Sequence, residues 1–541
     1  MRRSGLVIAG YVLLVLAWVV GNPAFAAPDE PAQYIRALAL ADGKSGRVAT
    51  YPQAPGTHME EGFRRLSRVV DVPGELVPEG QLPCFAFFMA TPANCTPAGT
   101  PFALSPEERL ALDPADGLPQ MIARLDVVSG PNGPELATTS YQAVYPPAAL
   151  GVAGLAGRLG WSPTSGLLFA RLASAAVCLA FLAAGWVWLL GGPDRQVLLV
   201  GPRLVGGLLA LTPMAVFLAA TVSGSGMEIA AAFAWVAGLL RAGRGPVSAA
   251  TTVGIAVAGV GLTTARQFGP AWLAVSVLAV AASGGLPVAR RRLAEQPRAA
   301  AGGGAALIVA LAFILYWDLA VFPGAPERSE PATLRGLTGQ SVGDLGRLLR
   351  ETVGVFGWLD AYPPLVVPLG WGALVVALTA VAVVVGRRSD RRVVGGVALG
   401  VLGTALLVTT TAYVQQGGAQ GRWLLPAAVA LPLVGGEVVA RRWRSGGSPT
   451  WPVPRASIVA AAGAVAALQG VSLWANARRH AVGNDGPLMF AGVSRWAPPG
   501  GWWPVAALAA GGLVALVAGA AGVARADGTS GEAAPACGEP T

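Results

Sequence analysis

GLVIAGYVLLVLAWVVGNPAFAAPDEPAQYIRALALADG, residues 5–43, begins with an apolar run and ends with a short polar segment that has helix signals. About 20 apolar residues are enough for a helix to cross the roughly 30 Å of bilayer hydrocarbon. Runs of this kind recur along all 541 residues, and the chain is 54% hydrophobic but only 12% charged. Soluble domains carry about twice that charged fraction. We therefore predict an all-α polytopic membrane protein.

The apolar runs predict about 12 transmembrane helices, of which the fourth and tenth are short. The expected spans are 5–26, 166–191, 200–222, 226–241, 247–265, 268–286, 303–322, 363–386, 394–414, 423–440, 456–475 and 502–523. The chain then divides into a first helix within 1–27, an extracytoplasmic loop subdomain at 28–165, a transmembrane bundle at 166–524 and a tail at 525–541. The tail is polar and rich in small residues, so we expect it to be disordered and cytoplasmic.

Arginines account for most of the net charge of +9, and they fall in short clusters between the apolar runs. Placing the N-terminus in the cytoplasm puts nearly every cluster on that side, as the positive-inside rule requires. These clusters are Arg2 and Arg3, Arg241 and Arg244, Arg290–Arg292, 387–392 and 441–444. We therefore expect a multi-pass protein of the plasma (inner) membrane with both termini cytoplasmic. Nucleic-acid binding is excluded, because no basic stripe with interleaved aromatics is present.

This orientation places the long loops on the outer face, where loops commonly carry function. They are 28–165, 323–362, 476–501 and the compact 415–422. Pro, Gly and alternating apolar residues predict a small, mixed α/β subdomain in the first loop. Its last part, 146–160, is too short to span and predicts an interfacial or re-entrant helix, with Tyr141, Tyr145 and Trp161 at headgroup level.

Cysteines and histidines are few. Cys84 and Cys95 lie in the first loop and are expected to form a disulfide, worth roughly 2–3 kcal/mol in the chain-entropy account, if that loop meets an oxidising compartment. Only two histidines occur, which excludes a metal site built on several of them. No cofactor is required by the sequence, although a divalent cation is compatible with it.

Asp29 and Glu30 stand where the first span ends, and three interpretations remain open. Asp29, Pro31 and Gly43 fit the N-cap, first turn and C-terminal glycine of a helix. The segment AFA-A fits a signal-peptide cleavage site. In the functional interpretation, adjacent residues do not share a helix face, so the two carboxylates have different roles. One accepts a proton from a substrate hydroxyl, and the other positions a substrate, an arginine or a metal ion.

Several motifs carry a family resemblance. PDEPAQYIRALALADG resembles the first-loop signature of GT-C glycosyltransferases, polytopic enzymes that use polyprenyl-phosphate sugars. More specifically, the chain resembles an actinobacterial membrane-protein family numbered 2142 among the domains of unknown function. The matching segments are YPPAALG (145–151), LTPMAVFLAATVSGSGMEIA (211–230), GVFGWLD (354–360), QGRWLLP (420–426), NARRHAVG (476–483) and WAPPGGW (496–502).

The resemblance implies that Asp29, with Glu30 nearby, is the catalytic carboxylate that deprotonates an acceptor hydroxyl, and that the sugar is transferred with inversion. The donor would be a polyprenyl-phosphate-linked sugar and the acceptor a cell-envelope glycan or glycolipid. The phosphate that leaves from the donor needs cations at the outer face. The expected substrate- and phosphate-binding residues are Arg422, Gln420, Arg266, Arg478, Arg479, Asp360 and Tyr145.

Each of these residues also has a purely structural interpretation. The arginines can snorkel to the interface, Asp360 can cap a helix, and Asp318 can simply face the interface. Arg171 lies inside the second helix and pairs with an acid or a lipid phosphate. Two positions depart from the family pattern: Gln33 stands where a histidine is common, and Ser225 stands at a position that relatives can fill with an acid. Gln33 cannot transfer a proton.

Two other functions compete with the transferase. A transporter or flippase of lipid-linked glycans fits the number of helices, but the halves show no convincing repeat and the helix centres are almost free of ionisable residues. A non-enzymatic protein that binds the cell envelope through its first loop would tolerate the loss of Asp29.

Overall fold

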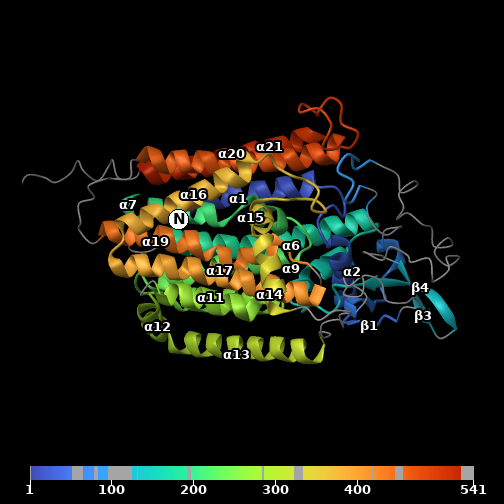
Figure 1. Cartoon of the computed structure of the whole chain (residues 1–541), viewed down its shortest axis with the longest axis horizontal. Coiled ribbons are helices and arrows are strands. Elements are labelled where there is room, and N and C mark those ends of the chain that lie inside the picture. Colours follow the sequence, from blue (N-terminus) through green and yellow to red (C-terminus); the bar gives the residue numbers. More distant parts are fainter. Residues whose placement is uncertain are drawn as a thin grey trace, which may run out of the picture.

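The structure, a computed structural model, describes residues 2–50, 65–77, 83, 85–94, 125–130, 132–191, 197–282, 285–321, 333–416, 418–444 and 455–525. Long helices run side by side along the longest axis of the molecule, and a short helix, α2 (Glu30–Ala41), lies with a small sheet at one end (Figure 1). We call this the α2 end of the bundle. Cys84 and Cys95 lie outside the described residues, as does the tail beyond residue 525.

The helices of the bundle fall where the apolar runs predict them, except α12 (Leu286–Ala294), which carries the Arg290–Arg292 cluster expected in a loop. They are α1 (Arg2–Gly21), α6 (Pro163–Leu190), α7 (Val197–Ala210), α8 (Pro213–Ala219), α9 (Gly224–Ala242), α10 (Ala249–Ala265), α11 (Gly269–Ala282), α12 (Leu286–Ala294), α13 (Pro297–Ala320), α16 (Val366–Val385), α17 (Arg388–Gln416), α18 (Leu425–Ala428), α19 (Ala430–Arg444), α20 (Arg455–Val482) and α21 (Trp502–Arg525). Outer helices such as α13 expose large apolar side chains, including Ile308 and Leu319, as lipid-facing helices do. The chain is an all-α polytopic membrane protein.

Each of the twelve expected spans coincides with a helix or a bent pair of helices. Eight described helices are long and apolar enough to cross a membrane, or up to ten if each bent pair is one span. Two of the twelve expected spans are not among these ten. They are α9, which includes Glu228 and Arg241, and α10, which has only 17 residues. The bend of 67° between α7 and α8 falls where the Thr212 side chain caps α8 and Pro213 starts it.

Two of the expected outer loops after the first, 323–362 and 476–501, contain helix. Residues 334–353 form α14 (Leu334–Gly343) and α15 (Leu345–Val353), and α20 continues to Val482 rather than ending near residue 475. Polar residues in the last turns of α20 suggest a loop in the sequence, but Asn476 and Arg479 are buried and hydrogen-bonded there. Asn476, for example, donates to Asn22 Oδ1 at 2.9 Å. Tertiary partners therefore lengthen the helix.

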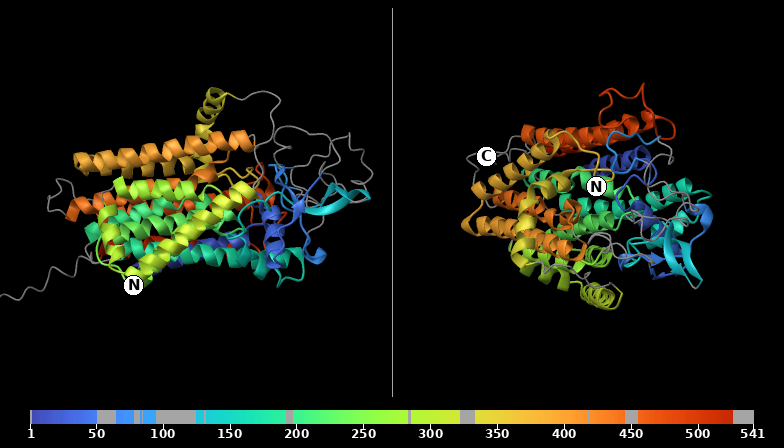
Figure 2. Two further views of the ribbon diagram at one scale, coloured as in Figure 1. Left: turned by 90° about the horizontal axis from the view of Figure 1, so that it is seen from below. Right: turned by 45° about the vertical axis from the view of Figure 1, so that its right-hand side comes forward.

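The first loop contributes a four-stranded antiparallel sheet of order β1-β2-β4-β3, which lies beyond the helix ends (Figure 2). Its strands are β1 (Arg47–Val48), β2 (Arg68–Val69), β3 (Leu125–Gly130) and β4 (Gly133–Ser140). The 3-10 helix η1 (Gly74–Leu76) follows β2. The last residue of β4, Ser140, donates from its hydroxyl to the Ala32 carbonyl at 2.7 Å, which fixes the sheet against α2.

The segment 146–160, predicted to form an interfacial or re-entrant helix, leaves Val152, Leu155 and Leu159 exposed. It contains α5 (Gly151–Gly157), which packs between α2 and α6. A Cβ on Gly154 would come within 1.8 Å of the Ala37 carbonyl oxygen, so α5 and α2 touch through their backbones. Tyr141 and Tyr145 are buried, and only Trp161, at 76% exposure, retains the surface position expected of all three. The tyrosines become part of the protein interior at the α2 end.

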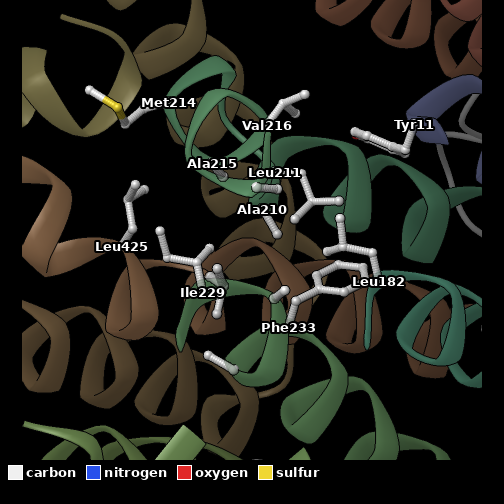
Figure 3. Close-up of a cluster of buried hydrophobic side chains, with 14 of the residues drawn as sticks. Tyr11, Leu182, Ala210, Leu211, Met214, Ala215, Val216, Ile229, Phe233 and Leu425 are labelled. Carbon is white, nitrogen blue, oxygen red and sulfur yellow. The ribbon is translucent and has the colours of Figure 1, made fainter. Parts of the chain in front are cut away.

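A continuous apolar core joins helices from both halves of the chain. Trp18 of α1 contacts Phe217 of α8 and Phe356 of the 354–361 segment, with ring centroids 5.1 and 4.9 Å apart. Deeper in the bundle, Leu182, Ile229 and Phe233 gather with residues of the α7–α8 bend (Figure 3). Helix α1 is therefore part of this core.

Helices α7 and α19 approach each other through glycines. A Cβ on Gly436 would lie 2.4 Å from the Pro202 carbonyl oxygen, whereas one on the adjacent Gly435 would meet only Leu378, at 3.6 Å. We predict that Gly436→Ala lowers the free energy of unfolding by about 1–3 kcal/mol, because the helices must separate. Gly435→Ala is the matched control and should be neutral or slightly stabilising, since alanine favours helix. Thermal unfolding in detergent micelles measures both; equal effects would contradict this packing.

Candidate active site at the α2 end of the bundle

Asp29 occupies an unusual backbone position directly before α2. Its φ of 63° is in the left-handed region, which aspartate tolerates better than most residues. Its backbone carbonyl accepts from Gln33 N at 2.9 Å, but its side chain makes no capping hydrogen bond. The interpretation of Asp29 as a side-chain N-cap is therefore wrong. The left-handed conformation turns the carboxylate away from the helix and toward other partners.

Two side chains from distant parts of the sequence hold the Asp29 carboxylate. Tyr141 donates to Oδ1 at 2.6 Å, and Arg422 forms an ion pair with Oδ2. Arg422 comes from the 3-10 helix η3 (Gly421–Leu424) and also donates to the Pro28 carbonyl at 3.3 Å. Arg422 is buried, whereas the Asp29 side chain keeps 18% exposure. The carboxylate is fixed in direction but still reachable.

Tyr141 acts in this contact as a proton donor. Burial, and after it the neighbouring Asp29 carboxylate, raise the pKa of Tyr141 well above its usual range. The phenol therefore stays protonated at neutral pH and donates to Asp29. Tyr141 was expected to face lipid headgroups and not to take part in a site. Because the contact depends on where β4 ends relative to α2, sequence alone gives no signal for it.

A second arginine, Arg266, follows α10 directly and lies between two aromatic rings. Its guanidinium carbon is 5.6 Å from the centroid of the Tyr145 ring and 5.5 Å from that of Trp423. Its Nη1 donates to Ser225 Oγ at 3.0 Å. Within the described part of the chain, no carboxylate lies within ion-pair distance of Arg266. The charge is thus held in place without being neutralised by direct pairing.

These residues line one pocket. Its cavity volume is about 20 Å³, so the pocket is narrow in this structure. Three elements far apart in sequence, the start of α2, the end of α10 and η3, supply its charged groups. The full lining is Asp29, Gln33, Gln142, Tyr145, Pro146, Ala149, Leu150, Gly224, Ser225, Ala265, Arg266 and Arg422. Asp29 is the only carboxylate among them.

Gln33 lines the pocket and holds the start of α9 in place. Its side-chain oxygen accepts from Gly224 N at 2.8 Å, so it fixes the first residue of α9. Ser225, one residue further, accepts from Arg266. Gln33 and Ser225, the two positions that depart from the family pattern, are therefore neutral side chains. Gln33 orients Gly224, and Ser225 orients Arg266. The N-terminus of α9, which carries partial positive charge, consequently faces the pocket beside Arg266.

Glu30 does not line this pocket. It is fully buried and forms a two-pronged ion pair with Arg171 of α6, at 2.8 Å (Nε to Oε1) and 2.6 Å (Nη2 to Oε2). Arg171 also donates to the carbonyls of Asn22 and Pro23, and Val222 N donates to Glu30. The sequence left open whether Arg171 pairs with an acid or with a lipid phosphate. In the structure it pairs with an acid, Glu30. The adjacent carboxylates point to different partners, and Glu30 positions an arginine.

Asp360 and Arg479 pair with each other, away from the pocket. Their Oδ2 and Nη2 atoms are 2.6 Å apart, and Arg479 also donates to the carbonyls of Phe85, Phe88 and Thr91. Burial raises the pKa of Asp360, while Arg479 acts in the opposite direction. This pair fastens the 85–94 segment to α20. Trp358, beside Asp360, donates from Nε1 to the Phe25 carbonyl in the loop that leads to Asp29.

The remaining expected residues also lie outside the pocket lining. Arg478 donates to the carbonyls of Gly486 and Pro487, and the backbone of Gln420 accepts from Trp423 N at 3.1 Å. Asp318 lies near the end of α13, where neighbouring Trp317 donates to the Val144 carbonyl. The described residues contain no group of three or more His, Cys, Asp or Glu side chains that could hold a metal ion.

The comparisons with known proteins identify the family. The family model described as Predicted membrane protein (DUF2142) matches residues 128–431, more than half of the chain. The chain belongs to this family. The matched region contains Tyr141, Arg266 and Arg422, whereas Asp29 precedes it. No curated protein matches the chain.

Among solved structures, the crystal structure of ArnT from Cupriavidus metallidurans in the apo state is similar, with 17% identity and a TM-score of 0.35. The match covers 71% of this chain and 66% of ArnT, so this chain spans just under two thirds of that protein's length.

The buried pair of Glu30 and Arg171 generates a stability prediction. Arg171→Met leaves a buried carboxylate without its cation, so we expect the free energy of unfolding to fall by about 3–5 kcal/mol. The double variant Glu30→Leu/Arg171→Met should regain much of this loss, because no charge is left unpaired. As control, Arg158→Met removes the partner of Asp42, which is 36% exposed, and should cost less than about 1 kcal/mol. Thermal unfolding in detergent measures all three; a stable Arg171→Met protein would contradict the assignment.

Proposed function

We propose that this protein is a GT-C-type glycosyltransferase that moves a sugar from a polyprenyl-phosphate donor to a cell-envelope glycan or glycolipid at the outer face of the plasma membrane. The observation that carries the proposal is that one pocket contains both a reachable carboxylate, Asp29, and an arginine, Arg266, that has no carboxylate within ion-pair distance among the described residues. The motif resemblance to polyprenyl-phosphate-sugar transferases supports it independently.

In this mechanism Asp29 is the general base. Its carboxylate accepts the proton of the acceptor hydroxyl, and the oxygen attacks the anomeric carbon of the donor sugar. The bond from that carbon to the phosphate oxygen breaks, and polyprenyl phosphate leaves with the electron pair. Because Asp29 acts as a base and the acceptor oxygen attacks the sugar directly, the transfer is a single displacement that inverts the anomeric centre.

Arg266 serves the leaving group. Negative charge grows on the donor phosphate as the bond breaks, and a fixed cation nearby stabilises it more strongly than water does. The rings of Tyr145 and Trp423 hold the guanidinium, and the N-terminus of α9 adds partial positive charge. Arg422 instead fixes the Asp29 carboxylate. The two arginines therefore have different roles.

The membrane setting fits a lipid donor. The pocket lies at the α2 end, and the arginine clusters of α12 and α19 lie toward the other end of the bundle (Figure 1). If the positive-inside rule applies, the clustered end is cytoplasmic and the pocket opens outside, with both chain termini in the cytoplasm. A polyprenyl chain can then stay in the bilayer while its phosphate reaches Arg266.

Replacing Asp29 tests the general base. We predict that Asp29→Asn lowers the transfer rate by about 100-fold or more, because the amide accepts no proton while it can still bond to Tyr141. The assay is transfer of labelled sugar from polyprenyl-phosphate donors in membranes that contain the protein. Asp42→Asn, at the other end of α2, is the control and should keep wild-type activity.

Thermal unfolding of both variants separates catalysis from folding, because Asp29→Asn also removes the counter-charge of buried Arg422. A folded Asp29→Asn protein with full activity would eliminate the catalytic role. A flippase or an envelope-binding protein would show no labelled product with any variant.

Replacing Arg266 tests phosphate binding. We predict that Arg266→Gln raises the KM for the donor on the order of 10- to 100-fold, the loss expected for a charge-assisted contact. The KM for the acceptor should stay nearly unchanged. Arg266→Lys keeps the charge and should recover part of the loss, whereas Arg335→Gln, on exposed α14, should have no effect. An unchanged donor KM in Arg266→Gln would remove Arg266 from the donor site.

A further inference from the structure

A second concave surface lies between the ends of α20 and α21 and shares no residue with the Asp29 pocket. We call it the α20–α21 groove; its main lining residues are Leu473, Trp474, Phe490, Trp502, Val505 and Leu513. Its volume is about 510 Å³, within the range of roughly 300–1,000 Å³ typical of small-molecule sites. Because the lining is almost wholly apolar, it suits a hydrocarbon ligand.

The groove is preformed, because the segment 484–500 that covers one end is fixed by specific contacts. Trp502 Nε1 donates to Ser494 Oγ at 3.0 Å, and the rings of Phe490 and Trp502 pack edge to face with centroids 5.1 Å apart. Asn484 donates from its side chain to the Asp360 carbonyl and from its backbone to the Met89 carbonyl. A ligand would therefore find the groove already shaped.

The rim of the groove resembles a membrane–water boundary. Met489 and Trp503 are 90% and 82% exposed, and both line the groove. Large apolar side chains so exposed are stable in contact with lipid. Since α20 and α21 are long and apolar enough to cross a membrane, the groove opens sideways toward the bilayer, where acyl chains are the abundant hydrocarbon.

The polar end of the groove carries positive charge. The Arg478 guanidinium lies 6.0 Å from the ring centroid of Trp474, a lining residue, and donates to the carbonyls of Gly486 and Pro487. In the described part of the chain it forms no ion pair with a carboxylate. The segment 484–500 adds Arg495 and Asp485, whose charges offset each other. The net positive charge at this end of the groove therefore comes from Arg478.

We propose that the α20–α21 groove binds one acyl chain of an anionic phospholipid, with the lipid phosphate at Arg478. The apolar lining recognises the chain, and the arginine selects a net negative headgroup over a zwitterionic one. The site goes beyond the transferase activity proposed above, since neither donor nor acceptor is required to occupy it.

Lipid binding to the purified full-length protein tests this site. The probes are phosphatidylglycerol and phosphatidylcholine with identical acyl chains, titrated in detergent and counted by native mass spectrometry. Wild type should bind phosphatidylglycerol about fivefold more tightly, the preference that one surface arginine provides. Arg478→Gln should abolish this preference, Arg478→Lys should keep it, and Arg495→Gln should leave it unchanged.

Filling the groove tests the apolar part. Ala510 lines the groove and is exposed, so Ala510→Phe should leave folding intact, as thermal unfolding checks, while reducing the binding of both lipids. Equal affinity of wild type for the two lipids, or a preference that survives Arg478→Gln, would overturn the headgroup assignment. Undiminished binding in Ala510→Phe would overturn the groove itself.

Discussion

The buried ion pair between Glu30 and Arg171 is the constraint on which the α2 end depends. Arg171 gathers the Glu30 carboxylate and the carbonyls of Asn22 and Pro23, so one side chain fixes the turn between α1 and α2. Glu30 in turn accepts from Val222 N, next to the start of α9. The pair leaves Asp29 at the surface of this assembly, and its left-handed backbone directs the carboxylate into the pocket. Burying two charges is costly, so the arrangement persists only because each is fully paired.

The two arginines of the pocket have different surroundings and different roles. Arg422 pairs with Asp29 and orients it, while Arg266 is held by two aromatic rings and a hydroxyl, none of which carries charge. Such a site can receive an anion without first breaking an ion pair. Tyr141 completes the arrangement as a protonated donor whose burial prevents it from ionising. The geometry suits a reaction in which a hydroxyl loses a proton as a phosphate leaves.

The sequence predicts the class of fold well, because apolar runs and arginine clusters are local signals. It also points to Asp29, Arg266 and Arg422, which line the pocket, since carboxylates and arginines at helix ends of a membrane protein are rare enough to notice. Tyr145, which also lines the pocket, is expected only through the motif resemblance. The sequence does not separate these residues from Arg479 and Asp360, which satisfy each other elsewhere. That distinction depends on which loop ends meet in space. Tyr141 and the supporting role of Gln33 are missed for the same reason, since both contacts join segments about 110 to 190 residues apart.

The central claim is a single displacement at the donor sugar, driven by one carboxylate. It is tested most directly by the anomeric configuration of the product, measured by proton NMR after transfer from a polyprenyl-phosphate sugar of known configuration by the purified protein. The proposed mechanism predicts a product of opposite configuration to the donor, because the acceptor oxygen that Asp29 deprotonates attacks the anomeric carbon directly. A product with retained configuration would mean that a covalent sugar–enzyme intermediate forms, for example on Asp29 itself, and would contradict the proposed role of Asp29 as a base.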